Sequence, residues 1–176
     1  NALTNKIIFN LKYYGFWVSY FVVARFLFLT YHFNSTKNLE ISEFFYVLIY
    51  GFRLDLSIAA YVVVLPFSLL LLGVFTKRKM LLKVHQTYSW LMVLLMNLLL
   101  SIDLFLYSYW NTRLDTTFLR YLNTPELMFA SVNMSEMLTS LLGFAALSHL
   151  TFRIINYLIY NELEEMDRAP LWSLPI

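Results

Sequence analysis

Long apolar stretches alternate with short polar segments along this chain of 176 residues. Four of them, residues 13–32, 44–73, 82–110 and 134–160, are long enough to cross a bilayer as helices, which takes about 20 residues. The pattern predicts an all-α fold, a polytopic membrane helix bundle. A fifth apolar stretch starts near residue 171, and we expect it to continue past Ile176. Residues 1–176 are therefore expected to be a piece of a longer protein.

The composition is typical of an integral membrane protein. Hydrophobic residues make up 60% of the chain and charged residues 14%, whereas a soluble domain has about half and about a quarter. The net charge is only +2 and no basic stripe is present, so we expect no nucleic-acid partner. The 176 residues contain no cysteine, which excludes disulfides and thiol catalysis within them.

The segment 111–133 differs from the four spans because charged and apolar residues are mixed in it. Asp115 can cap one short helix, and Thr124-Pro125-Glu126 has the cap, first-turn proline and first-turn acid of another. We expect two short interfacial helices here rather than a span.

The basic residues predict the orientation of the spans. Lys77, Arg78 and Lys79 lie between the second and third spans, and short loops rich in lysine and arginine stay in the cytoplasm. Lys6 and Lys12, which precede the first span, put the N-terminus on the same side. Segments 34–43 and 111–133 are then expected on the outer side.

Ionisable residues inside the spans, or just beyond their outer ends, are the candidate functional residues. They are Arg25, Arg53, Asp55, Asp103, Arg113, Asp115 and Arg120. A charged side chain at the centre of a membrane helix costs roughly 2.5 to 3.5 kcal/mol even on insertion scales, so each needs compensation. By their distance from the predicted helix ends, the four charges inside the spans all fall in the outer half of the membrane. We expect them to converge there.

Arg53 and Asp55 do not neutralise each other, because two residues correspond to about 200° of rotation on a helix. We expect Asp55 to pair with Arg25 and Arg53 to pair with Asp103. Buried pairs of this kind can serve a ligand or can simply fix how helices pack. Both interpretations remain open from the sequence.

Other residue patterns carry little chemistry. His32, His85 and His149 belong to three different segments without metal-binding spacing, so we expect interfacial or hydrogen-bonded histidines and no metal site. No complete catalytic constellation is present, and we assign no catalytic residue to this chain.

Several short motifs resemble those of a known membrane domain. The second span carries Gly51-Phe52-Arg53-Leu54-Asp55, and the third ends in Asp103 followed by tyrosines. Arg113-Leu114-Asp115 and the stretch 118–125 follow. Together these resemble the N-terminal membrane domain of lipoteichoic acid synthase-like proteins, which are phosphoglycerol transferases and sulfatase-like proteins of the alkaline phosphatase superfamily.

The resemblance implies five membrane helices followed by an extracytoplasmic α/β catalytic domain, expected after residue 176. That domain would use a threonine nucleophile and a divalent metal (Mn, Mg or Zn), with no cofactor held by residues 1–176. It would transfer a phosphoglycerol or related headgroup from a phospholipid, or hydrolyse a phosphate or sulfate ester.

We therefore expect the membrane domain of a phosphoglycerol or phosphoethanolamine transferase-like, or sulfatase-like, enzyme of the bacterial envelope. Its location would be the cytoplasmic (inner) membrane, and its partners membrane lipids with anionic phospholipid headgroups. Arg53, Arg113 and Arg120 are the candidates to meet such a headgroup, since guanidinium matches phosphate geometry. Alternatively, Arg113 and Arg120 only anchor an interfacial helix to acidic lipid.

Two functions of other classes remain as alternatives. One is a non-catalytic membrane subunit of a larger complex. The other is a small transporter or channel subunit, in which the buried charges line an ion path.

Overall fold

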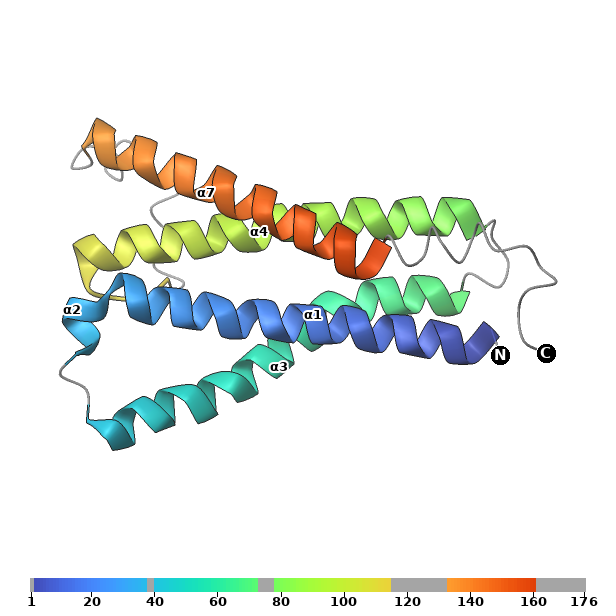
Figure 1. Ribbon diagram of the computed structural model, residues 1–176, viewed down its shortest axis with the longest axis horizontal. Helices are drawn as coiled ribbons and strands as arrows, with labels where there is room; N and C mark the ends of the chain where they lie inside the picture. Colours follow the sequence, from blue (N-terminus) through green and yellow to red (C-terminus); the bar gives the residue numbers. More distant parts are fainter. Residues whose placement is uncertain (1, 38–39, 73–77, 115–132, 161–176) are drawn as a thin grey trace. The chain divides into compact units, whose positions relative to one another are not determined.

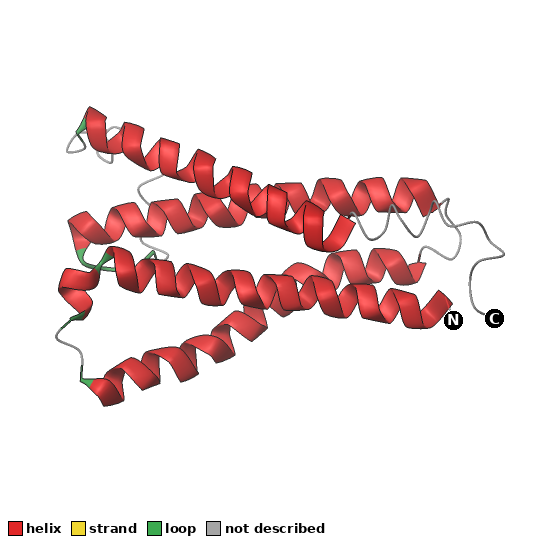
Figure 2. Ribbon diagram, viewed as in Figure 1, coloured by secondary structure: helices red, strands yellow, loops and turns green. Residues whose placement is uncertain are grey.

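The computed structural model describes residues 2–37, 40–72, 78–114 and 133–160, and these residues form helices and short turns without a strand (Figure 2). The helices follow the chain in the order α1 (Ala2–Tyr31), α2 (Phe33–Thr36), α3 (Ile41–Leu72), α4 (Arg78–Trp110) and α7 (Met134–Ile155), as labelled in Figure 1. A π-helical turn, η2 (Asn156–Tyr160), continues α7.

Four of the helices in the described part of the chain are long and apolar enough to cross a membrane. The candidate spans are Ile7–Tyr31, Ile41–Leu69, Leu82–Tyr109 and Met134–Tyr160. The predicted all-α, multi-pass membrane architecture is confirmed at this level. The interfacial helices expected within 111–133 and the fifth span expected from residue 171 fall almost entirely on 115–132 and 161–176, which lie outside the described residues.

Helix α1 begins about three turns earlier than the sequence pattern predicted. The prediction placed Lys6 and Lys12 before a span starting at residue 13, but both lysines lie within Ala2–Tyr31. Residues 2–12 contain no glycine or proline, so nothing in the local sequence ends the helix at residue 13, where the predicted apolar stretch begins.

Helix α3 also begins earlier than predicted, at Ile41 rather than residue 44, because its first turn is capped. The side chain of Glu43 accepts a hydrogen bond from the backbone N–H of Glu40 (3.0 Å), and the N–H of Phe44 bonds the Glu40 carbonyl (3.0 Å). This is the acidic half of a capping box, which satisfies backbone groups that have no partner within the helix.

Asn111 ends helix α4 in a left-handed conformation, with φ of 52°, while its N–H still bonds the carbonyl of Tyr107 (3.0 Å). Asparagine tolerates this conformation better than most residues and commonly terminates helices in it. At the start of α7, the side chain of Asn133 accepts from the N–H of Ser135 (3.3 Å) as an N-terminal cap.

The chain divides into two compact units, Asn1–Met92 with Phe152–Ile176, and Val93–Thr151. In the first unit, α1 packs against α3, and the two helices approach each other from about the middle of α3 onward (Figure 1). The fully buried side chains of this unit include Tyr13, Trp17 and Ile155.

Candidate functional site

An ion pair joins α1 to α3 inside the first unit. Arg25 donates to both carboxylate oxygens of Asp55, from Nη2 to Oδ1 at 2.6 Å and from Nε to Oδ2 at 3.3 Å. The two side chains are 15% and 7% exposed, so the pair is shielded from solvent. The Arg25–Asp55 pair expected from the sequence is therefore present, as a bidentate contact of the strong, charge-assisted kind.

The third nitrogen of the Arg25 guanidinium also reaches α3, where Nη1 donates to the carbonyl of Val47 at 3.1 Å. Val47, Gly51 and Asp55 are spaced four residues apart and share one side of the helix. A Cβ at Gly51 would overlap the guanidinium. The missing side chain at Gly51 is thus what lets Arg25 lie along the α3 backbone and bind on both sides of it.

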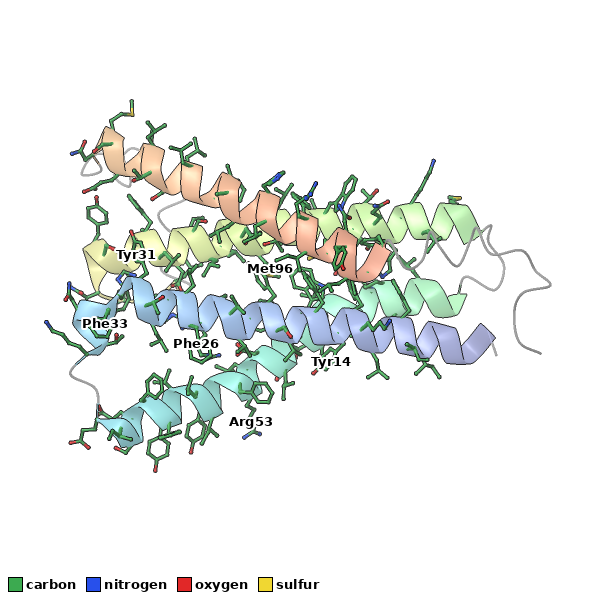
Figure 3. The ribbon with its side chains drawn as sticks, viewed as in Figure 1. Tyr14, Phe26, Tyr31, Phe33, Arg53 and Met96 are labelled. Carbon is green, nitrogen blue, oxygen red and sulfur yellow. The ribbon has the colours of Figure 1, made fainter. Side chains whose placement is uncertain are left out.

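Arg53 lies on the opposite side of α3 from this contact. Asp55 is buried whereas Arg53 is exposed, as their rotation of about 200° predicts. Figure 3 shows the Arg53 side chain on the side of α3 turned away from α1. No hydrogen bond or ion pair of the Arg53 side chain to another described residue is found.

In the second unit, Asp103 binds the segment that follows α4. Its Oδ2 accepts from Arg113 at 2.6 Å (Nη2) and 3.2 Å (Nε), and its Oδ1 accepts from the backbone N–H of Leu114 at 2.8 Å. Asp103 is 6% exposed. The sequence-based pairing of Asp103 with Arg53 is wrong, because Asp103 is bound instead by residues 113 and 114, and no bond from Arg53 to it is found.

The Asp103 contact depends on the turn at Asn111. Asp103 lies about two turns, or roughly 10 Å, before the end of α4 at Trp110. The left-handed Asn111 reverses the chain, so that Arg113 comes back alongside the helix it has just left. The side chain of Arg113 remains 61% exposed although its guanidinium is fixed by a buried carboxylate.

The first unit also contains a buried polar network that the sequence analysis did not identify. Its members are Tyr13 on α1, His85 and Ser89 on α4, and Tyr160 on η2. The Ser89 hydroxyl is bonded to Tyr160 (2.6 Å) and Tyr13 (2.9 Å) and donates to the His85 carbonyl (2.9 Å). The ring Nδ1 of His85 meets the Tyr160 hydroxyl at 2.7 Å.

One assignment of protons satisfies the network. If Tyr160 donates to Ser89, its oxygen accepts from Nδ1–H of His85, and the proton of His85 is then on Nδ1. The other ring nitrogen, Nε2, is buried without a hydrogen-bond partner among the described residues. The rings of Phe9 and Tyr13 pack on the imidazole, with centroids 5.0 and 4.7 Å away.

The π turn η2 explains how Tyr160 reaches this network. Tyr160 follows Ile155 by five residues, and in an α-helix the two side chains would point in clearly different directions. A π turn has more residues per turn, so Ile155 and Tyr160 both lie on the buried side. The sequence did contain a signal for part of the network, since His85, Ser89 and Asn97 fall at intervals of four or eight on one side of an apolar helix. Asn97 is buried as well and donates to Thr151 at 3.4 Å.

The remaining predicted residues stand as follows. Asp115 and Arg120 lie outside the described residues. His85 is hydrogen-bonded as expected, His32 is buried and His149 is exposed. The described part of the chain contains no group of three or more residues able to hold a metal ion. The convergence of all the charges at one site stays a prediction, since the two ion pairs belong to different units.

Chemically, the described residues provide fixed cations and not a reactive group. Arg25 is held between α1 and α3, whereas Arg113 is held at one edge of a span with most of its side chain exposed. Of the two, only Arg113 is arranged to meet an external anion. Comparisons with protein-family models, with curated proteins and with solved structures give no match to this chain.

Proposed function

We propose that this chain is the membrane domain of an enzyme of the bacterial envelope that acts on phospholipid headgroups. The class is that of the phosphoglycerol or phosphoethanolamine transferase-like and sulfatase-like proteins, with a metal-dependent catalytic domain beyond residue 176. In this proposal the N-terminus is cytoplasmic, and the end of α4 lies at the outer side of the cytoplasmic membrane.

The arrangement of Arg113 on Asp103 carries the proposal. Arg113 follows the end of the candidate span Leu82–Tyr109 by four residues, where the hydrocarbon region gives way to the headgroups. A guanidinium at this depth matches the charge and the planar geometry of a phosphodiester. Asp103 holds the arginine in one orientation, which lowers the entropy lost when a headgroup binds.

Four of the motif residues behind the resemblance have defined structural roles in the described part of the chain. Gly51 leaves the space that the Arg25 guanidinium fills, Asp55 binds that guanidinium, and Asp103 binds Arg113. These residues thus fix the positions of Arg25 and Arg113 within their units.

A transporter with charges along an ion path is less well supported. In the described spans, Asp55 and Asp103 lie deep in their helices, and each is neutralised by an arginine. A path for cations needs carboxylates that can bind and release an ion, which a bidentate arginine contact opposes.

The decisive test uses the full-length protein. Its intact mass should exceed that of residues 1–176 by tens of kilodaltons, and proteoliposomes with headgroup-labelled phosphatidylglycerol should produce diacylglycerol and a labelled product. We expect the substitution Arg113→Gln to lower this rate by about tenfold or more, because a hydrogen bond to a charged group contributes about 1.5–3 kcal/mol, and Arg113→Lys to lower it less.

Arg153→Gln is the matched control, since Arg153 is an exposed arginine in the last turn of α7. A protein that ends close to Ile176 would contradict the enzyme proposal and leave a non-catalytic subunit. A full-length protein that consumes neither phospholipid headgroups nor phosphate or sulfate esters would also contradict it.

A further inference from the structure

The two sides of α3 differ sharply in their contacts. The buried side repeats every three or four residues and consists of Gly51, Asp55, Ala59, Val62, Val63 and Pro66. The opposite side carries the Arg53 side chain, which points away from α1 (Figure 3). Six exposed residues of the central part of α3 lie within about 60° of Arg53, and they are Tyr46, Ile49, Tyr50, Ser57, Ala60 and Val64, whereas Leu56 at the edge of this side is half-buried. We refer to Arg53 and these six residues as the Arg53 face.

Arg53 lies near the middle of its span. The candidate span Ile41–Leu69 has Asp55 as its central residue, so Arg53 lies about 3 Å from the centre along the helix axis. The headgroup regions are then about 15 Å away in either direction. Arginine side chains reach the interface from positions near helix ends, not from the centre of a span. The Arg53 guanidinium therefore needs an anion supplied within the hydrocarbon region.

This chain does not supply that anion from the described spans. Their acidic residues are Glu43, Asp55, Asp103 and Glu136. Asp55 and Asp103 are bound to Arg25 and Arg113, whereas Glu43 and Glu136 lie in the first turns of α3 and α7, at the ends of their spans. The described spans of a second copy meet the same limit. A symmetric contact of two α3 helices would moreover bring two Arg53 side chains together, and like charges repel there.

We infer that the Arg53 face docks a membrane-spanning helix of a different protein, and that this helix carries an aspartate or glutamate near its middle. A carboxylate at that depth neutralises the guanidinium and is itself neutralised by it, which explains how both persist in the membrane. The inference is independent of the proposed enzymatic function.

The shape of the face fits a helix as its occupant. Ser57 and Ala60 are small and follow Arg53 by one and two turns, which allows a second backbone to come close. The Ser57 hydroxyl is turned to the Arg53 carbonyl at 3.1 Å and does not obstruct the approach. On the other side of Arg53, the rings of Tyr46 and Tyr50 stack with centroids 5.8 Å apart and border the docking surface.

The first experiment establishes that Arg53 is not used within the chain. In detergent, the purified variant Arg53→Leu should unfold at the same temperature as the wild type or at a higher one. A lower unfolding temperature, comparable to that of Asp55→Asn, would place the partner of Arg53 inside this protein and overturn the inference.

The second experiment identifies the occupant in native membranes. A photo-crosslinking phenylalanine analogue replaces Ala60 on the Arg53 face, or Ile58 as a control, which lies at about the same depth on α3 but about 160° around the helix from Ala60. We expect a product at Ala60, heavier by one polypeptide, whose attached protein has an acidic residue near the centre of a span. Arg53→Gln should lower its yield about tenfold or more, while Arg53→Lys should preserve it.

Exchanging the charges completes the test. Arg53→Glu combined with the substitution of the partner's acidic residue by arginine should restore the crosslink that either change alone removes. Adducts with the mass of a phospholipid, crosslinks between two copies of this chain, a partner without an intramembrane carboxylate, or a yield unaffected by Arg53→Gln would each overturn the inference.

Discussion

Gly51 and Arg25 are complementary in shape, because the guanidinium of Arg25 fills the space beside the α3 backbone that any side chain at residue 51 would need. The same guanidinium binds the Val47 carbonyl on one side of Gly51 and the Asp55 carboxylate on the other. The packing of α1 on α3 and the pairing of Arg25 with Asp55 thus both depend on the absence of a side chain at residue 51.

The substitution Gly51→Ala should destabilise the protein. Its Cβ would displace the Arg25 guanidinium, and overpacking of this kind typically costs about 1–3 kcal/mol. We expect a lower unfolding temperature in detergent, measured by tryptophan fluorescence. Gly15→Ala is the control, because nothing lies within 4 Å of a Cβ at Gly15, and alanine there should be neutral or stabilising by about 0.5–1 kcal/mol. Equal effects of the two substitutions would contradict the role of Gly51.

Removing one charge of the Arg25–Asp55 pair should be worse than removing both. Asp55→Asn leaves a shielded guanidinium without its counter-charge, which costs about 3–5 kcal/mol in buried pairs. The double variant Arg25→Leu/Asp55→Leu should recover a large part of that loss. Thermal unfolding of the single and double variants measures the difference, and a double variant no more stable than Asp55→Asn would count against the pair as the dominant interaction.

Exchanging the two charges should not restore stability. In the combination Arg25→Asp/Asp55→Arg, the long side chain starts from α3 and no longer lies over Gly51. If the exchanged protein were as stable as the wild type, stability would depend on the two charges alone and not on the space that Gly51 leaves for the guanidinium.

The sequence was sufficient for those features that depend on periodicity along one helix. The four spans follow from their apolar length, and the opposite orientations of Arg53 and Asp55 follow from their separation of two residues. The partner of Asp55 was also accessible, because Arg25 is the only charge deep in the first predicted span. These inferences need no knowledge of turns.

Features that depend on a departure from regular helix were not accessible. The partner of Asp103 is Arg113 because Asn111 reverses the chain, and a left-handed asparagine cannot be told from an ordinary one by pattern. Tyr160 reaches His85 because α7 ends in a π turn, which shifts the side-chain register by one residue. The early start of α3 follows from the Glu40–Glu43 cap, which a boundary drawn by hydropathy ignores.

The substitution Asp103→Asn should loosen the turn after α4. It removes the charged acceptor of Arg113 and weakens the bond from the Leu114 amide, and hydrogen bonds to charged groups contribute about 1.5–3 kcal/mol. We expect the Leu114 amide to exchange its hydrogen about 10 to 100 times faster, as measured by mass spectrometry. Ser108→Ala is the control, since the Ser108 hydroxyl is bonded only to its own helix at Leu104. Unchanged exchange in Asp103→Asn would mean that the carboxylate does not hold the turn.

The substitution Tyr160→Phe should destabilise the first unit much more than Tyr157→Phe, although both remove one hydroxyl from η2. The Tyr160 hydroxyl bonds Ser89 and His85 in a buried site. Its loss removes one bond from Ser89 and leaves the Nδ1–H of His85 without its acceptor, at a cost of about 1–3 kcal/mol. Tyr157 is 72% exposed, so removing its hydroxyl leaves no buried partner without a hydrogen bond. Unfolding temperatures of the two variants in the same detergent give the comparison. Similar temperatures would show that packing of the Tyr160 ring, and not the hydrogen-bond network, holds η2 against α1 and α4.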